Sequence, residues 1–115
     1  MGRKHFLTVT FLALSLLACA KAPFADYQDG SYVGEGQGRR RHLKVEITLA
    51  DGRMTDCRVV EQYEGAYYAK EPLTEIPKRI LEAQDPRVDG ISGSTLTSEG
   101  IMKAVENALE QAGNP

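Results

Sequence analysis

The sequence predicts an α+β fold, in which two helices pack on one face of a small antiparallel β-sheet. Between residues 29 and 63, apolar and polar residues alternate and turn residues separate the runs, which is typical of antiparallel strands. Between residues 73 and 112, apolar residues instead recur at helical spacing. The chain has 115 residues, of which 42% are hydrophobic and 26% charged, so its size and composition suit one folded domain.

The first 18 residues are expected to be a signal peptide and not part of this fold. A short basic start containing Arg3 and Lys4 precedes an apolar run, Phe6–Ala18. This run is shorter than the roughly 20 residues that cross a bilayer, but it suits the hydrophobic region of a secretory signal.

The signal ends in a sequence, Leu16–Cys19, that resembles a bacterial lipobox. The resemblance implies cleavage before Cys19 and acylation of that residue. The mature protein would then be exported and held by lipid at the periplasmic or outer face of a bacterial membrane. A plain signal peptide and an uncleaved anchor remain alternatives. We expect residues 19–28 to form a tether and residues 29–115 to form the folded domain.

The first predicted strand is rich in glycine. Gly34, Gly36 and Gly38 fall on one of its faces, which indicates that something bulky approaches the strand closely there. The basic run Arg39–His42 follows. It is expected to be a solvated loop, with docking to an acidic partner or to lipid as the alternative.

A β-hairpin is predicted at Asp51-Gly52, between strands at Leu43–Leu49 and Arg53–Tyr63. A two-residue loop would place Ile47 opposite Asp56, and a shift of one residue would reverse every side chain. A three-residue loop aligns apolar residues instead, so we expect that loop, with Gly52 in the left-handed conformation. The pairs that it predicts are Ile47 with Thr55, Val45 with Cys57, and Leu43 with Val59.

Two helices are predicted in the second half of the chain. A loop is expected over Glu64–Pro72, where apolar residues show no period. The first helix is expected from Glu75 to about Gln84, capped by Thr74 and with Pro77 in its first turn. The last helix is expected over about Ser98–Ala112. The residues expected to face the sheet are Leu73, Ile76, Ile80, Ile101, Val105, Ala108, Leu109 and Ala112.

Several functions are disfavoured by composition. The formal charge of −2 gives no basis for binding nucleic acid, which calls for a strongly basic surface. His42 is the one histidine beyond the expected signal, so neither a typical structural zinc site nor a Ser-His-Asp site is favoured. Cys57 lies in an apolar strand pattern and is expected to be a small core residue.

The segment Asp89–Ser98 is the one most suited to chemistry. Small hydroxyl residues surround Gly93, which allows the backbone to approach a ligand closely. The segment leads into the last helix, where unpaired amides and the helix dipole favour a phosphate group. From the residues alone, a cluster of hydroxyls that only caps this helix remains an alternative.

The same segment resembles the flavinylation motif of the FMN-binding domain family, written Asp-x-x-Ser/Thr-Gly-Ala-Ser/Thr-x-Ser/Thr. That domain occurs in the C subunit of the sodium-translocating NADH:quinone reductase, in the G subunit of the Rnf complex and in exported lipoproteins. Ser94 stands where the family usually has Ala, which places a second hydroxyl beside the expected acceptor. The residues at the motif's fixed positions are Asp89, Ser92, Gly93, Thr95 and Thr97.

The resemblance implies an electron carrier rather than a stand-alone enzyme. FMN would be joined through a phosphoester to Thr95 by a flavin transferase that uses FAD and magnesium and releases AMP. Asp89 would help the transferase to recognise or activate the site. Ser92, Gly93 and Thr97 would hold the loop and the phosphate, with Ser94 beside them in the site. The redox partner would be an unidentified membrane or periplasmic protein. A non-covalent FMN binder and a cofactor-free lipoprotein interaction module are the alternatives.

The position of the flavin ring is a separate expectation. The isoalloxazine is expected to lie against the glycine face of Gly34 and Gly36, beside Tyr63, Tyr67 or Tyr68. These tyrosines could instead be ordinary core or rim residues.

Overall fold

The computed structural model describes residues 21–113, with the side chains of residues 66–69 left out. The expected signal peptide at residues 1–18 and the expected lipid attachment at Cys19 lie outside the described residues, as do the side chains of Tyr67 and Tyr68. Within residues 21–113, no helix combines the length and apolar character needed to span a membrane.

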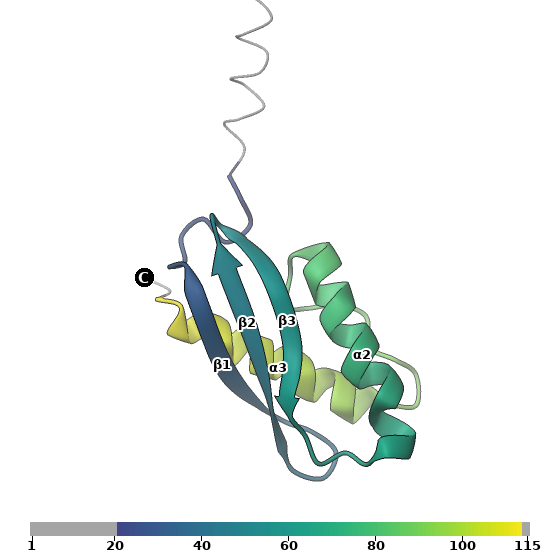
Figure 1. Ribbon diagram of the computed structural model, residues 1–115. Coiled ribbons are helices and arrows are strands. Elements are labelled where there is room, and N and C mark those ends of the chain that lie inside the picture. The colour runs from purple at the N-terminus through teal and green to yellow at the C-terminus, as the bar shows by residue number, and fades with distance from the viewer. Residues whose placement is uncertain (1–20, 114–115) are drawn as a thin grey trace, which may run out of the picture.

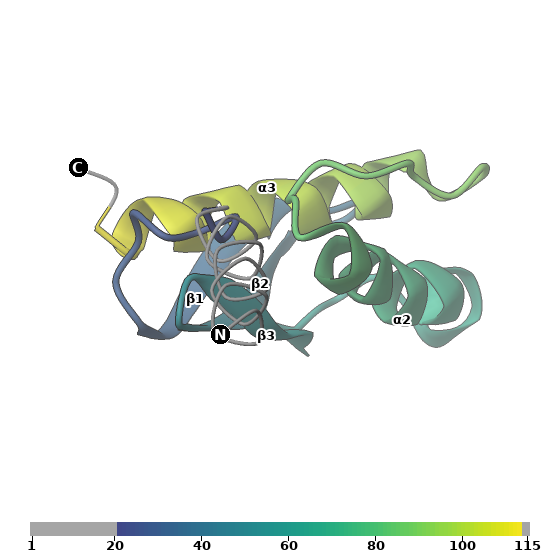
Figure 2. The same ribbon diagram turned by 90° about the horizontal axis from the view of Figure 1, so that it is seen from above.

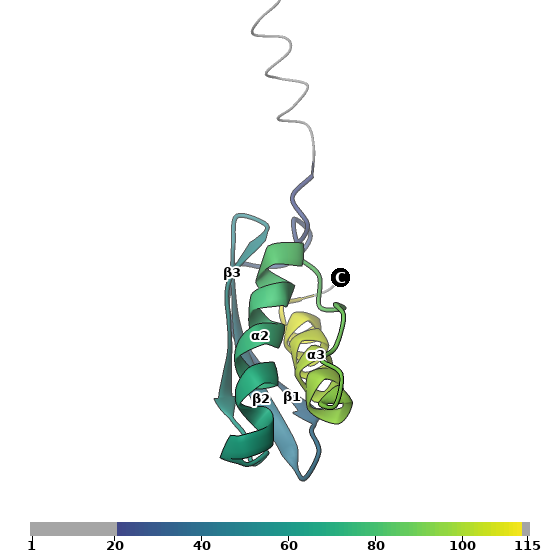
Figure 3. The ribbon, with the colours of Figure 1, turned by 90° about the vertical axis from the view of Figure 1, so that its right-hand side faces the viewer.

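Three antiparallel strands form one sheet in the order β1-β2-β3, and two helices cover one face of it (Figures 1 and 3). The predicted fold class is therefore confirmed. Helix α3 packs on β1 and β2, whereas α2 lies beside β3 (Figure 2). The elements are β1 (Gly30–Gln37), β2 (His42–Ala50), β3 (Arg53–Glu61), α2 (Ala66–Ala83) and α3 (Thr95–Gln111).

The core lies between the sheet and the two helices. Alternate residues of β2 point inward and are almost fully buried, as the alternation in the sequence predicts. The helices meet them with residues at helical spacing, which confirms the predicted apolar stripes. The central buried residues are Leu43, Val45, Ile47 and Leu49 from β2, Ile76 and Ile80 from α2, and Ile101, Val105 and Ala108 from α3.

The segment before β1 is attached to the domain. Phe24, in the part of the chain expected to be a tether, is 5% exposed, and its amide donates to the carbonyl of Gly52 at 2.7 Å. The amide of Gln28 donates to the carbonyl of Ala112 at 2.9 Å. Residues 24–28 thus cover one end of the core.

The glycine face of β1 is in close contact with helix α3. A Cβ atom added to Gly34 would collide with the carbonyl oxygen of Ala104, and one added to Gly36 would collide with that of Gly100. The bulky element that the glycine pattern predicts is therefore the backbone of α3. Because the two backbones approach so closely, no space remains on this face for a ligand.

The predicted register of the β2–β3 hairpin is wrong. The turn has two residues, with positive φ at both Asp51 (53°) and Gly52 (77°), as in a type I′ turn. Gly52 therefore has the predicted left-handed conformation. A β-bulge at Thr55 then shifts the pairing by one residue, so that Ile47 pairs with Cys57 and not with Asp56. The bulge aligns the apolar faces without the longer loop.

Cys57 is buried in this hairpin, as expected. The side chain is 5% exposed. Burial, together with the neighbouring charge of Asp56, raises the pKa of the thiol to about 12. The thiol is therefore protonated at neutral pH and has a structural role.

Helix α2 begins nine residues earlier than predicted, at Ala66, so the expected loop over Glu64–Pro72 is mostly helical. Pro72 and Pro77 both lie inside the helix, and both are buried. Their burial offsets the backbone hydrogen bonds that proline removes. Thr74 is not a cap, because its hydroxyl donates to the carbonyl of Lys70 at 2.9 Å.

Side-chain amides cover parts of both sheet edges. At the β3 edge, the amide group of Gln84 accepts from the Met54 N–H and donates to the Met54 carbonyl, both at 2.8 Å. At the β1 edge, Asn107 accepts from the Glu35 N–H at 3.1 Å, and Gln111 donates to the Val33 carbonyl at 2.7 Å. These side chains occupy backbone groups to which another strand would bind.

Candidate functional site

The site is built around the first residue of α3. The chain enters the helix through a tight turn, in which the Ser94 amide donates to the Ile91 carbonyl at 2.9 Å. Gly93 takes the third position of this turn with φ of 85°, the positive value that a type II turn requires. No atom lies within 4 Å of a Cβ atom added to Gly93, so its surroundings are open.

Ser98, in the first turn of α3, stabilises this turn through two hydrogen bonds. Its buried hydroxyl accepts from the Ile91 amide at 3.1 Å and donates to the Ser94 carbonyl at 2.8 Å. One side chain inside the helix therefore holds both ends of the turn. The predicted start of α3 at Ser98 is three residues late, since the helix begins at Thr95.

Thr95 is exposed at the N-terminus of α3. It lines a hollow of about 420 Å³ together with Arg39, Glu64, Gly93, Ser94, Leu96 and Thr97. Ser94 is the N-cap residue but makes no side-chain cap hydrogen bond, which disfavours the interpretation that the hydroxyl cluster only caps the helix. The first amides of an α-helix have no partner within the helix, and in such a position they can bind an anion.

Thr97 points away from solvent, toward a buried carboxylate. Its hydroxyl donates to Glu64 Oε1 at 2.8 Å. The same carboxylate accepts the Arg39 amide at 2.7 Å and the Arg40 amide at 3.2 Å. Glu64 is 2% exposed, and it ties the β1–β2 loop to the first turn of α3.

Glu64 is charged in this environment. Burial alone would raise the pKa of its carboxyl group, but the hydrogen bonds from the Arg39 amide, the Thr97 hydroxyl and the Arg40 amide, with the positive charge of Arg39, lower it overall. Gly38 allows this contact, because a Cβ atom there would collide with Glu64 Oε1.

Glu64 and Arg39 are residues of this candidate site that the sequence did not reveal. Glu64 lies 33 positions before Thr97 in the sequence, and Arg39 lies 58 positions before it. The packing of the sheet and the helices brings both residues to the motif. The basic run containing Arg39 was visible in the sequence, but its proximity to Thr95 was not.

Asp89 and Ser92 take different positions from Thr95. Both are exposed, and neither lines the hollow at Thr95. The Asp89 carbonyl accepts from Arg79 of α2 at 2.9 Å, and Asp89 borders a separate, open hollow with Arg79 and Arg87. The structure thus brings Gly93, Ser94, Thr95 and Thr97 together and leaves Asp89 on an adjoining surface.

The expected place for the flavin ring is corrected by the structure. The face of Gly34 and Gly36 is covered by α3, so no ring can lie there. Tyr63 is 44% exposed and lies beneath Arg41, with 5.1 Å between the guanidinium carbon and the ring centroid. The large apolar side chain beside Thr95 is Leu96, which is 63% exposed.

These features form a small α+β domain in which the hollow at Thr95 is suited to a phosphate-bearing organic cofactor. An uncapped helix N-terminus and Arg39 suit the phosphate, and an exposed hydroxyl lies beside them. The FMN-binding domain family matches residues 38–110, and the chain belongs to this family. It is therefore an FMN-binding protein.

Relatives of the chain include much longer proteins. The chain is 31% identical over 87 residues to NADH:acrylate oxidoreductase of Vibrio harveyi, covering 76% of the chain and 9% of that protein. It is 31% identical over 85 residues to NADH:fumarate oxidoreductase of Klebsiella pneumoniae (strain 342), covering 74% and 9%. It is 34% identical over 87 residues to an uncharacterized protein of Treponema pallidum (strain Nichols), covering 76% and 24%.

A solved structure shares the fold. The crystal structure of a Clostridium perfringens protein superimposes with a TM-score of 0.61 at 22% identity, covering 75% of this chain and 88% of that one. At this identity, the similarity concerns the fold.

Proposed function

We propose that this protein is an electron carrier that works outside the cytoplasm with FMN joined covalently to Thr95. The observation that carries the proposal is that Thr95 is exposed at the N-terminus of α3, in a hollow that Arg39 also lines. Family membership supports FMN as the group bound there.

The residues present fit a phosphoester at this position. The amides of the first turn of α3 would face the phosphate, and the Arg39 guanidinium would offset its remaining negative charge. Gly93 leaves open space on the approach to Thr95. The backbone amides of Arg39 and Arg40 already donate to the Glu64 carboxylate. The amides that would bind the phosphate are therefore those of the first turn of α3.

The attachment reaction is a transfer of a flavin phosphate group. A flavin transferase would break the pyrophosphate bond of FAD and join the FMN phosphorus to Thr95 Oγ1, releasing AMP and the hydroxyl proton. Thr95 is the acceptor in this reaction, and Asp89, on the neighbouring surface, would contact the transferase. Bound FMN supplies the redox chemistry, while the protein supplies position and electrostatics.

The chain spans a small part of its curated relatives, 9% of two of them. We propose that the domain carries electrons and that other proteins or domains act on the substrates. The donor and acceptor would be membrane or periplasmic proteins. Acylated Cys19 would hold the carrier at the membrane surface.

The test is the intact mass of the full chain co-produced with a flavin transferase, followed by peptide mapping of residues 88–103. We expect a gain of one FMN less one water on Thr95, and the same spectrum would show cleavage before Cys19 with its acyl groups. Thr95→Ala should remove the FMN, whereas Thr74→Ala, at an exposed threonine of α2 outside the motif, should retain it.

Other outcomes would change the proposal. Covalent FMN on Thr95→Ala would contradict the assignment of the acceptor, and attachment at Ser94 would relocate it. A yellow protein that loses its colour on acid precipitation would be a non-covalent FMN binder. A colourless protein, beside an active transferase and a loaded control, would favour a cofactor-free interaction module.

A further inference from the structure

The β1–β2 loop has a concentration of positive charge that the flavin site does not explain. The chain carries a formal charge of −2, yet three consecutive arginines, Arg39–Arg41, occupy this one loop. Arg39 lines the hollow at Thr95. Within residues 21–113, Arg40 and Arg41 are exposed and form no ion pair. The single arginine Arg53 shares this property, whereas Arg58, Arg79 and Arg87 all form ion pairs.

The loop is held in a fixed shape. The Gly38 amide donates to the Arg41 carbonyl at 2.9 Å, and the amides of Arg39 and Arg40 are bound by the buried Glu64 carboxylate. Arg41 lies over the exposed ring of Tyr63. A loop that served only to connect two strands would not need a buried carboxylate 24 residues away to fix its backbone.

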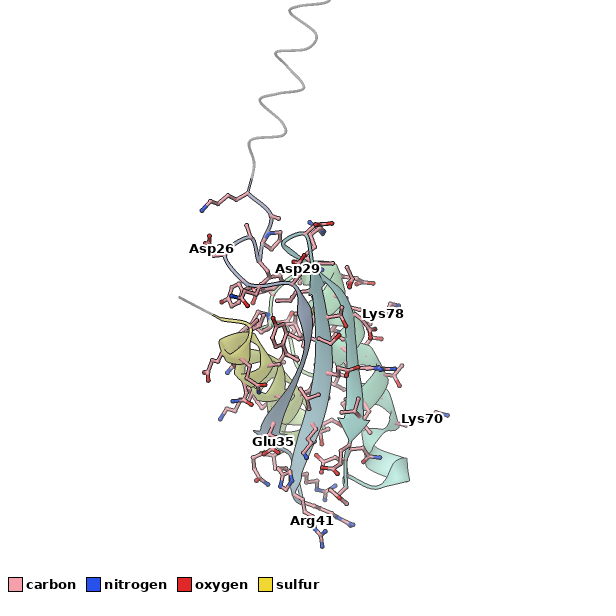
Figure 4. The ribbon with its side chains drawn as sticks, turned by 60° about the vertical axis from the view of Figure 1, so that its left-hand side comes forward. Asp26, Asp29, Glu35, Arg41, Lys70 and Lys78 are labelled. Carbon is pink, nitrogen blue, oxygen red and sulfur yellow. The ribbon has the colours of Figure 1, made fainter. Side chains whose placement is uncertain are left out.

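This surface adjoins the flavin site. Arg40, Arg41, Gln62, Tyr63 and Gly65 line a hollow of about 410 Å³, and the residues next to them, Arg39 and Glu64, line the hollow at Thr95. Arg41 lies at the opposite end of the molecule from Asp26, near which the described chain begins (Figure 4). The basic surface thus lies at the end of the domain opposite to its N-terminal segment.

We propose that Arg40, Arg41 and Tyr63, here called the arginine tip, form the docking surface for an acidic protein that exchanges electrons with the flavin. This proposal rests on the proposed electron-carrier function. Three properties support it: its position beside the cofactor site, its unpaired positive charge, and an exposed aromatic ring. Arginine and tyrosine are enriched in protein interfaces, and opposite charge accelerates encounter.

A protein partner is favoured over a lipid surface by geometry. If Cys19 carries the lipid, the membrane that holds the protein lies beyond the end marked by Asp26, not beyond the arginine tip (Figure 4). Complexes between electron-transfer proteins are short-lived and bury small interfaces, and a compact charged patch beside the cofactor suits such an interface.

The test uses the full chain and oxidised flavodoxin, an acidic electron-transfer protein, as the probe. NMR titration at low ionic strength should show shifts at residues 39–41 and 63, and salt should weaken the binding. Arg40→Glu together with Arg41→Glu should weaken it by about tenfold or more. The matched control, Arg53→Glu with Lys78→Glu, makes the same change in net charge at exposed positions distant from the loop and should have little effect.

The binding is measured on both the flavin-loaded chain and the Thr95→Ala variant, so that failure of the docking proposal is distinguishable from failure of flavin attachment. Equal weakening by the tip variant and the control would overturn the proposal, since net charge alone would then explain binding. Tip-dependent binding to vesicles of equal parts phosphatidylglycerol and phosphatidylcholine, without binding to flavodoxin, would overturn it in favour of a membrane surface.

Discussion

Glycines have opposite roles in two regions of this molecule. On β1, Gly34 and Gly36 have no free space, because the backbone of α3 lies where their side chains would be. At the entry to α3, a Cβ atom added to Gly93 would meet no atom within 4 Å beyond the adjacent residues, and glycine is required there for its positive φ. The first region fixes α3 against the sheet, and the second leaves the approach to Thr95 open. A glycine in the sequence thus marks either a close contact or an open approach, and only its surroundings distinguish the two.

The largest expected effect comes from filling the closed region. Gly34→Ala should destabilise the protein by about 3 kcal/mol or more, because the new methyl group collides with the backbone of α3 and the helix must move. Urea unfolding monitored by circular dichroism measures this loss. Val33→Ala, on the exposed face of the same strand, is the control and should cost much less. A Gly34→Ala variant with the same free energy of unfolding as the wild type would contradict the close contact between β1 and α3.

Glu64 connects the loop after β1 with the first turn of α3 through its hydrogen bonds. Glu64→Gln should destabilise the protein by about 2 kcal/mol at neutral pH, because an amide replaces a charged acceptor of three hydrogen bonds. Unfolding experiments at several pH values measure this difference, with the exposed Glu71→Gln as the control.

The same variant tests the lowered pKa of Glu64. Because the carboxyl has a lower pKa in the folded state, its stabilising effect is complete above its ordinary value of 4.5 and is lost as the pH falls through the folded-state pKa. The stability difference between wild type and Glu64→Gln should therefore shrink below about pH 4.5. A difference independent of pH would show that the charge of Glu64 contributes nothing.

The smallest effect on stability is expected in the open region. Gly93→Ala should cost only about 1 kcal/mol, since the positive φ is strained for alanine but no atom is displaced. Flavin attachment, measured by intact mass, should nevertheless fall, because the turn presents Thr95. Gly93→Asn should retain more attachment, since asparagine tolerates positive φ better. A large loss of stability in Gly93→Ala would show that Gly93, like Gly34 and Gly36, lies in a close contact.

Local patterns in the sequence were sufficient for much of the fold. The alternation of β2 and the helical spacing of α3 predicted which residues are buried, because each pattern reflects one element against one core. The motif around Thr95 could be identified through its resemblance to a family motif, because its residues are contiguous in the chain.

Features that depend on distant residues were not predictable in this way. The bulge at Thr55 alters the strand pairing without any change in the residue pattern. The early start of α2 depends on burial of Pro72 and Pro77, which overrides their low helix propensity. The ring was assigned to the glycine face because the sequence indicates a close neighbour there without identifying it as α3.

The side-chain amides at the sheet edges have a consequence for how this domain can be combined with others. A three-stranded sheet has two edges, and exposed edges invite pairing with strands of neighbouring proteins. Gln84, Asn107 and Gln111 occupy backbone groups on both edges and come from α2 and α3 or the residue that follows, so they are intrinsic to the domain. The unit can therefore stand beside other folded modules in a longer polypeptide, or among many copies of itself, with less tendency for its strands to extend into theirs.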